Sequence, residues 1–169
     1  YFSHIVKKYP QIVQAIKNRD ETYDHLFMDS NSIIYDCLRS IEYDSNYESN
    51  IITAVIAKIE DYIDTIKPSK TIFIAYDGVA PLAKMNQQKT RRYKSDFQSN
   101  NNYLNEDTPH ANKWSTSNVT PGTSFMIQLS KAMNQYFLNK EKQYHVDKII
   151  VSAADEPGEG EHKLFHYIR

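Results

Sequence analysis

Residues 71–78 of the chain read Thr-Ile-Phe-Ile-Ala-Tyr-Asp-Gly, and this segment decides the fold class. Its first six residues are β-branched, apolar or aromatic, which is typical of a buried central strand, and the Asp-Gly pair marks a turn after it. Segments 26–28 and 147–153 predict a further strand before and after it. Because helical patterns separate these three strands, the sequence predicts an α/β fold with a mainly parallel central sheet.

The clearest helical pattern covers residues 48–66 and is stopped by Pro68. Its apolar residues recur at steps of three and four, which places them on one face of a helix. Residues 98–118 are rich in asparagine and have no apolar period, so we expect a long polar loop. In that loop Trp114 either holds the chain against the fold or contacts a ligand. Further helices are expected at 4–17 with an interruption at Pro10, around 33–41, and at 80–97, 123–139 and 159–169.

The composition excludes several classes of protein. The chain has 169 residues with 20 Lys and Arg against 21 Asp and Glu, so it is one domain or part of one, and it is not a globally basic nucleic-acid binder. It contains no run of 18 apolar residues, so we expect no membrane span. We expect the single cysteine, Cys37, to be buried and reduced, in a cytoplasmic protein or alternatively a nuclear one. Because the chain starts at Tyr1 and stops at Arg169 within a helical pattern, we expect a fragment.

Acidic residues follow all three predicted strands. Asp29 follows the first strand, Asp77 the second, and Glu159 and Glu161 lie shortly after the third. The carboxyl ends of parallel strands meet at one edge of a sheet, so these four carboxylates are expected to lie close together. Crowded carboxylates repel one another unless a cation lies among them, and hard oxygen ligands favour Mg²⁺ or Mn²⁺. The alternative, that each acid caps a helix or belongs to a turn, stays open at this point.

Residues 78–95 contain no acid and carry five Lys or Arg residues. On a helix, Lys84, Gln88, Arg91 and Arg92 lie at i, i+4, i+7 and i+8, which is one face. Such a face suits a phosphate group, because arginine offers a two-pronged hydrogen-bond donor, and the helix begins just after Asp77. The alternative is a solvated basic face. Tyr35, six residues past Asp29, is a candidate for stacking on a base.

Four motifs, in order along the chain, resemble those of the Xrn/Rat family of 5′-to-3′ exoribonucleases. They are residues 27–34 (FMDSNSII), 75–92 (AYDGVAPLAKMNQQKTRR), 118–126 (NVTPGTSFM) and 157–163 (PGEGEHK). The resemblance implies a three-layer PIN-like fold, related to that of flap nucleases. Residues 1–169 would be the N-terminal portion of the catalytic domain, with an incomplete sheet.

The resemblance also implies a function, namely Mg²⁺- or Mn²⁺-dependent hydrolysis of single-stranded RNA with a 5′-monophosphate to mononucleotides, in RNA turnover. The implied catalytic and metal-binding carboxylates are Asp29, Asp77, Glu159 and Glu161. The implied ligands of the 5′-phosphate are Lys84, Gln88, Arg91 and Arg92.

The chain departs from the family pattern in two respects. Tyr35 stands where the family usually has a stacking histidine, and we expect the flat phenol ring to keep the stacking role. The family has further aspartates, including an Asp-x-Asp pair, downstream of the region that ends here at Arg169. Whether one or two metal ions bind therefore stays open.

Two other functions remain alternatives. A non-catalytic module would grip 5′-phosphorylated RNA ends through the basic face without cutting them, because the downstream aspartates are missing. A structure-specific flap-type DNA nuclease is the second alternative. The motif from Lys84 to Arg92 argues against it, because flap enzymes of the related fold lack that motif.

Overall fold

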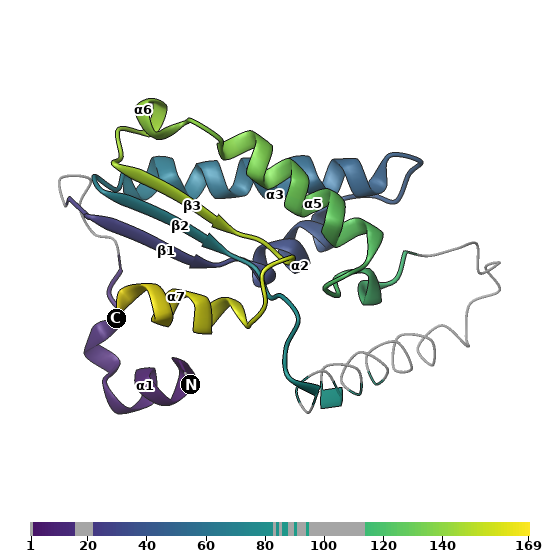
Figure 1. The fold of residues 1–169 in the computed structure, drawn as a ribbon, viewed down its shortest axis with the longest axis horizontal. Coiled ribbons are helices and arrows are strands. Elements are labelled where there is room, and N and C mark those ends of the chain that lie inside the picture. Colours follow the sequence, from purple (N-terminus) through teal and green to yellow (C-terminus); the bar gives the residue numbers. More distant parts are fainter. Residues whose placement is uncertain are drawn as a thin grey trace.

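A computed structural model describes residues 2–15, 22–82, 84, 86, 87, 90, 94 and 114–169. It contains a three-stranded sheet with helices on both faces (Figure 1). No helix in these ranges is long and apolar enough to cross a membrane. Gln88, Arg91 and Arg92 of the predicted phosphate-binding face lie outside the described residues, as does most of the predicted polar loop.

The sheet consists of β1 (His25–Asp29), β2 (Thr71–Ala75) and β3 (Lys148–Ser152), in that order and all parallel. All five residues of β2 are buried, as expected for a central strand. The register aligns Asp29 with Ala75 and Ala75 with Ser152, so the three carboxyl ends lie side by side at one edge. The predicted α/β class with a mainly parallel sheet is confirmed, and the sheet formed by the described residues is open.

The two faces of the sheet carry different helices because successive residues of a strand point to opposite sides. Ile72 and Ile74 of β2 belong to the main apolar core, which α2 (Asn31–Ser40), α3 (Tyr47–Ile66) and α5 (Ser124–Phe137) complete. Phe73 points the other way and its ring lies 5.1 Å from that of Tyr167 in α7 (Gly160–Ile168). In Figure 1, α7 accordingly lies on the opposite side of the sheet from α3 and α5.

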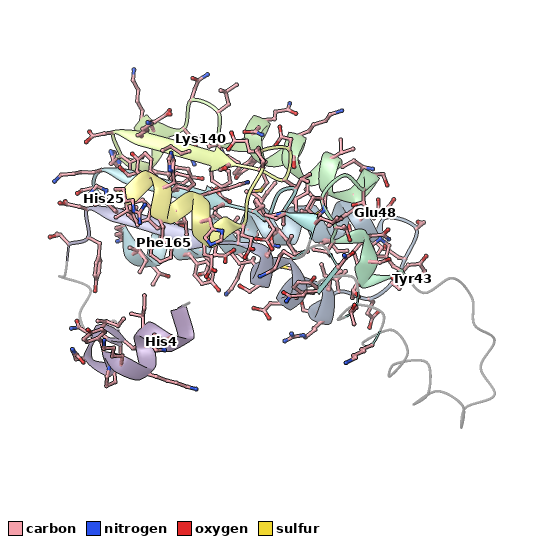
Figure 2. All side chains as sticks on the ribbon, turned by 60° about the horizontal axis from the view of Figure 1, so that its bottom comes forward. His4, His25, Tyr43, Glu48, Lys140 and Phe165 are labelled. Carbon is pink, nitrogen blue, oxygen red and sulfur yellow. The ribbon has the colours of Figure 1, made fainter. Side chains whose placement is uncertain are left out.

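The long helix α3 runs antiparallel to the strands. Figure 2 shows Glu48, near its start, and His25, at the start of β1, toward opposite ends of the molecule. The face predicted from the isoleucine spacing is the buried one, since Ile51, Val55, Ile59 and Ile63 are at most 2% exposed. A residue in the left-handed region, Lys67 with φ of 50°, ends the helix before Pro68.

The remaining elements agree with the prediction in part. The first helical segment is shorter than expected: α1 (Phe2–Lys8) and a 3₁₀ turn, η1 (Pro10–Ile12), are followed by extended backbone at Val13. A short helix, α6 (Glu141–Tyr144), was not predicted. Residues 82, 84, 86, 87, 90 and 94 are helical, as expected for the basic segment.

Trp114 holds the chain against the fold, which decides between the two roles that the sequence left open. Its indole Nε1 donates a hydrogen bond of 2.8 Å to the Glu48 carboxylate on α3. Its ring meets those of Tyr47 and Phe125 edge-on, with centroids 5.6 and 5.2 Å apart. The 3₁₀ turn η2 (Thr116–Asn118) and α5 follow directly, so this contact fixes where the chain rejoins the core.

Candidate active site

The segments that follow β1, β2 and β3 are tied together by hydrogen bonds between distant residues. The Asp77 backbone N–H donates to Oδ1 of Asn31, at 3.1 Å, which joins the end of β2 to the start of α2. The Asp77 carboxylate in turn accepts a hydrogen bond of 2.8 Å from the Gly160 backbone N–H, at the start of α7. Asp77 therefore links all three strand ends.

Gly160 lies against two of the predicted carboxylates and is flanked in sequence by the other two. A Cβ atom at this position would lie 2.6 Å from Oδ1 of Asp29 and 3.1 Å from its Cγ, so the Asp29 carboxylate packs directly on the Gly160 backbone. Asp77 bonds the same residue, and Glu159 and Glu161 are its neighbours in sequence. We call these four acids around Gly160 the carboxylate junction.

The acids of the junction act on one another electrostatically. Although Asp29 retains exposed surface, the protein atoms around its carboxyl group remove part of its hydration, and this raises the pKa of Asp29. The negative charges of Asp77, Glu161 and Glu159 raise that pKa further, while a hydrogen bond from the Asn31 backbone opposes the shift. The junction therefore has an excess of negative charge that a cation would relieve.

Lys84 supplies one positive charge at this site. Its Nζ lies 3.0 Å from Oε2 of Glu159, whose side chain is 15% exposed. The first residue of the predicted phosphate-binding face thus lies against the junction, as expected from its position just after β2. The other three residues of that face, Gln88, Arg91 and Arg92, lie outside the described part of the chain.

Close backbone contacts hold the loops beneath these side chains. The Gly78 N–H donates to the Gly158 carbonyl at 2.8 Å, and the Gly158 N–H donates to the Val79 carbonyl at 3.0 Å. A Cβ on Gly78 would lie only 1.7 Å from the Glu156 carbonyl oxygen, so any larger residue there would force the two loops apart. The glycine is required by this approach of two backbones.

All four acids of the junction offer hard carboxylate oxygens, the kind of donor that Mg²⁺ prefers. Within the described ranges, no group of three or more His, Cys, Asp or Glu side chains is arranged so that it could hold a metal ion. A complete protein cage is not needed, since Mg²⁺ usually binds through one or two carboxylates and keeps several waters. Glu159 is paired with Lys84 in the structure, so a metal ion at the junction would share this carboxylate with Lys84 or displace it.

Tyr35, the predicted stacking residue, lies on α2 and is half-buried, with part of its surface packed against the apolar core. Cys37, on the same helix, is buried and free, as expected. His162, next to Glu161, is exposed.

Sequence reasoning missed two residues that shape the site. Asn31 orients the Asp77 backbone, and Lys163 donates hydrogen bonds to two strand ends. Both lie in the motifs singled out above, but their partners are 46, 87 and 10 residues away, and no spacing rule connects such pairs.

Comparison with known proteins assigns the whole chain to a family. A family model described as XRN 5′-3′ exonuclease N-terminus matches residues 1–169. The chain is 32% identical to 5′-3′ exoribonuclease 1 of Saccharomyces cerevisiae, 35% to that of Schizosaccharomyces pombe and 32% to that of Homo sapiens, with all of the chain aligned in each case. It spans 12%, 14% and 11% of these relatives, respectively.

Proposed function

This chain belongs to the XRN 5′-3′ exonuclease N-terminus family, and from that premise we propose that it forms the catalytic part of a Mg²⁺- or Mn²⁺-dependent 5′-to-3′ exoribonuclease. The substrate we propose is single-stranded RNA with a 5′-monophosphate, which is degraded to mononucleotides in RNA turnover. The observation that supports this most strongly is the carboxylate junction, where Asp29 packs on Gly160, Asp77 accepts a hydrogen bond from the Gly160 N–H, and Glu159 is paired with Lys84.

In this proposal the junction holds the metal ion. The residues that would hold it are Asp29, Asp77, Glu159 and Glu161. When bound, such an ion activates a water molecule and stabilises the leaving oxygen in phosphodiester cleavage. The Gly160 N–H and the Asn31 side chain keep Asp77 in place, and the close packing of Asp29 on Gly160 limits how far that carboxylate can move.

The basic face is proposed to select the RNA end. Lys84, together with Gln88, Arg91 and Arg92, would bind the 5′-phosphate, which carries up to two negative charges that a 5′-hydroxyl lacks. Lys84 supports this role because its ammonium group already borders the junction at Glu159. A phosphate held there would leave the next phosphodiester bond close to the carboxylates. Tyr35 is proposed to stack on the first base with the part of its ring that remains exposed.

The test compares two RNAs that differ only at the 5′ end, one with a phosphate and one with a hydroxyl, in the presence of Mg²⁺. We expect rapid release of mononucleotides from the 5′-phosphorylated RNA alone, and loss of that release in Asp77→Ala. Asp64→Ala is the matched control, because Asp64 is an exposed acid near the end of α3, which leads into the opposite end of β2. Equal rates on the two RNAs, or full activity of Asp77→Ala, would refute the proposal.

A second candidate is a binding module that grips 5′-phosphorylated RNA without cutting it. It is favoured by the ion pair between Lys84 and Glu159, which neutralises one junction acid without a metal ion. It predicts binding that survives EDTA and weakens with salt, and no mononucleotide release. Flap-structured DNA belongs in the same assay, since its cleavage in preference to RNA would indicate a structure-specific DNA nuclease. The location we propose is cytoplasmic, with the nucleus as the alternative, in keeping with the reduced thiol of Cys37.

A further inference from the structure

Lys163 lies on the first turn of α7 and reaches back to the ends of two strands. Its Nζ donates hydrogen bonds of 2.8 Å to the carbonyl of Tyr76 and of 2.8 Å to the carbonyl of Ala153. Tyr76 directly follows β2 and precedes Asp77, while Ala153 directly follows β3. One ammonium group therefore bridges the two strand ends from which the acids of the carboxylate junction emerge.

The same residue is fixed to the turn that carries the glutamates. The Lys163 backbone N–H donates to the Glu159 carbonyl at 3.0 Å, so the side chain has its origin on the helical turn that holds Glu159 and Glu161. Together with the bond from the Gly160 N–H to Asp77, this residue ties the end of β2 to the turn that carries the two glutamates.

The charge of Lys163 is not used in a direct pair with a junction acid. Both of these hydrogen bonds go to backbone carbonyls, so they leave carboxylate oxygens available to a cation. Partial burial lowers the pKa of Lys163, and the nearby acids Glu156, Asp77 and Asp155 oppose that shift. A half-buried lysine that is held by two backbone carbonyls close to acidic side chains is suited to a structural role.

We propose that Lys163 is a positioning residue: by bridging the Tyr76 and Ala153 carbonyls it sets the spacing between Asp77 and the Glu159–Glu161 turn that a divalent ion requires. This inference rests on the proposed function, because it concerns the metal ion that the junction would hold. Residues that orient the ligands of a metal ion commonly change its affinity by 10–100-fold when they are replaced.

The sign of the effect distinguishes positioning from two simpler roles. If Lys163 were only a nearby positive charge, its removal would strengthen the binding of a cation. If it only stabilised the fold, its removal would lower the unfolding temperature and leave the affinity of the folded protein for the ion unchanged. Loss of a positioning residue weakens ion binding, although the removal of a positive charge would by itself strengthen it.

The experiment measures Mn²⁺ affinity of the full chain by isothermal titration calorimetry, well below the unfolding midpoint of each variant. We expect Lys163→Met to bind Mn²⁺ about tenfold more weakly than the wild type or worse. Lys142→Met, which removes an exposed lysine from α6, should bind Mn²⁺ as the wild type does. Thermal unfolding followed by circular dichroism confirms that each variant is folded during the titration.

Lys163→Gln keeps an amide donor without the charge and provides the same test if the methionine variant does not fold. Unchanged or tighter Mn²⁺ binding by a folded variant overturns the inference and leaves the proposed function intact if the wild type still degrades 5′-phosphorylated RNA. The inference is also overturned if neither variant folds, because the lysine would then serve the fold as a whole. Absence of Mn²⁺ binding by the wild type overturns the metal-dependent function and the inference with it.

Discussion

Replacing Gly160 with alanine tests whether the packing of Asp29 on this glycine sets the geometry of the carboxylate junction. The added Cβ would lie 2.6 Å from Oδ1 of Asp29, whereas ordinary contacts begin at 3.4 Å. The carboxylate must therefore recede by about 0.8 Å, the difference between these distances. A displacement of about 1 Å in a catalytic group costs on the order of 100-fold in rate.

The same substitution should have little effect on stability. Gly160 is the first residue of α7 and has no positive φ, so alanine fits the backbone and favours the helix by roughly 0.5–1 kcal/mol. We therefore expect a free energy of unfolding within about 1 kcal/mol of the wild type, together with an activity about 100-fold lower. The assays are urea unfolding and single-turnover cleavage of 5′-phosphorylated RNA.

Gly122→Ala is the matched control and should show the opposite pattern. No atom lies within 4 Å of the added Cβ, but the φ of 89° strains any side chain, so stability falls by about 1 kcal/mol while activity is kept. The reasoning is refuted if Gly160→Ala cleaves RNA within threefold of the wild-type rate. A loss of several kcal/mol of stability in Gly160→Ala would show instead that α7 moves and Asp29 does not.

Three further predictions concern the fold. Trp114→Phe removes the hydrogen bond to Glu48 and should lower the free energy of unfolding by about 1–3 kcal/mol, measured in urea, and an equal loss in a chain that already carries Glu48→Ala would contradict this. Ile59→Ala, at a position that is 0% exposed, should cost about 2–5 kcal/mol in the same assay, and a cost below about 1 kcal/mol would mean that α3 is not packed as described. The hydrogen bond from Lys70 lowers the pKa of Asp24, so its small stabilising effect is present above pH 3.8 and is lost as the pH falls through the lowered pKa. Asp24→Asn should therefore flatten the acid side of the pH dependence of the unfolding temperature, and an unchanged slope would argue against the pair.

The regular elements of this fold could be predicted because their signals are local. The strand at Thr71–Ala75 and the buried face of α3 follow from residue type and spacing alone. The helix α6 has only four residues, too few to show a period, and its Tyr144 bonds Glu60 on α3, which no local pattern reveals. Short helices of this kind are determined by tertiary contacts.

The acidic residues of the candidate site could be predicted from the sequence, but the hydrogen bonds that position them could not. The positions of Asp29 and Asp77 after parallel strands indicated that they would meet, and the packing around Gly160 agrees. The hydrogen bond that Asn31 accepts from the Asp77 N–H and the bridge made by Lys163 join residues far apart in sequence through backbone groups, which carry no sequence signal. The role of Trp114 could not be assigned from the sequence, because the sequence around a tryptophan in a polar segment is the same whether its ring packs inward or faces outward.

The bond between Asp77 and Gly160 spans 83 residues, whereas that between Asn31 and Asp77 spans 46. During synthesis on the ribosome, which proceeds from the amino terminus, the ends of β1 and β2 can therefore meet long before the third segment has been translated. A nascent chain at that stage holds two acids in proximity without the backbone N–H that supports one of them. The junction can therefore assemble only when the start of α7 has emerged from the ribosome. A nascent chain that is still attached to the ribosome and its messenger RNA before that point lacks the two glutamates of the junction.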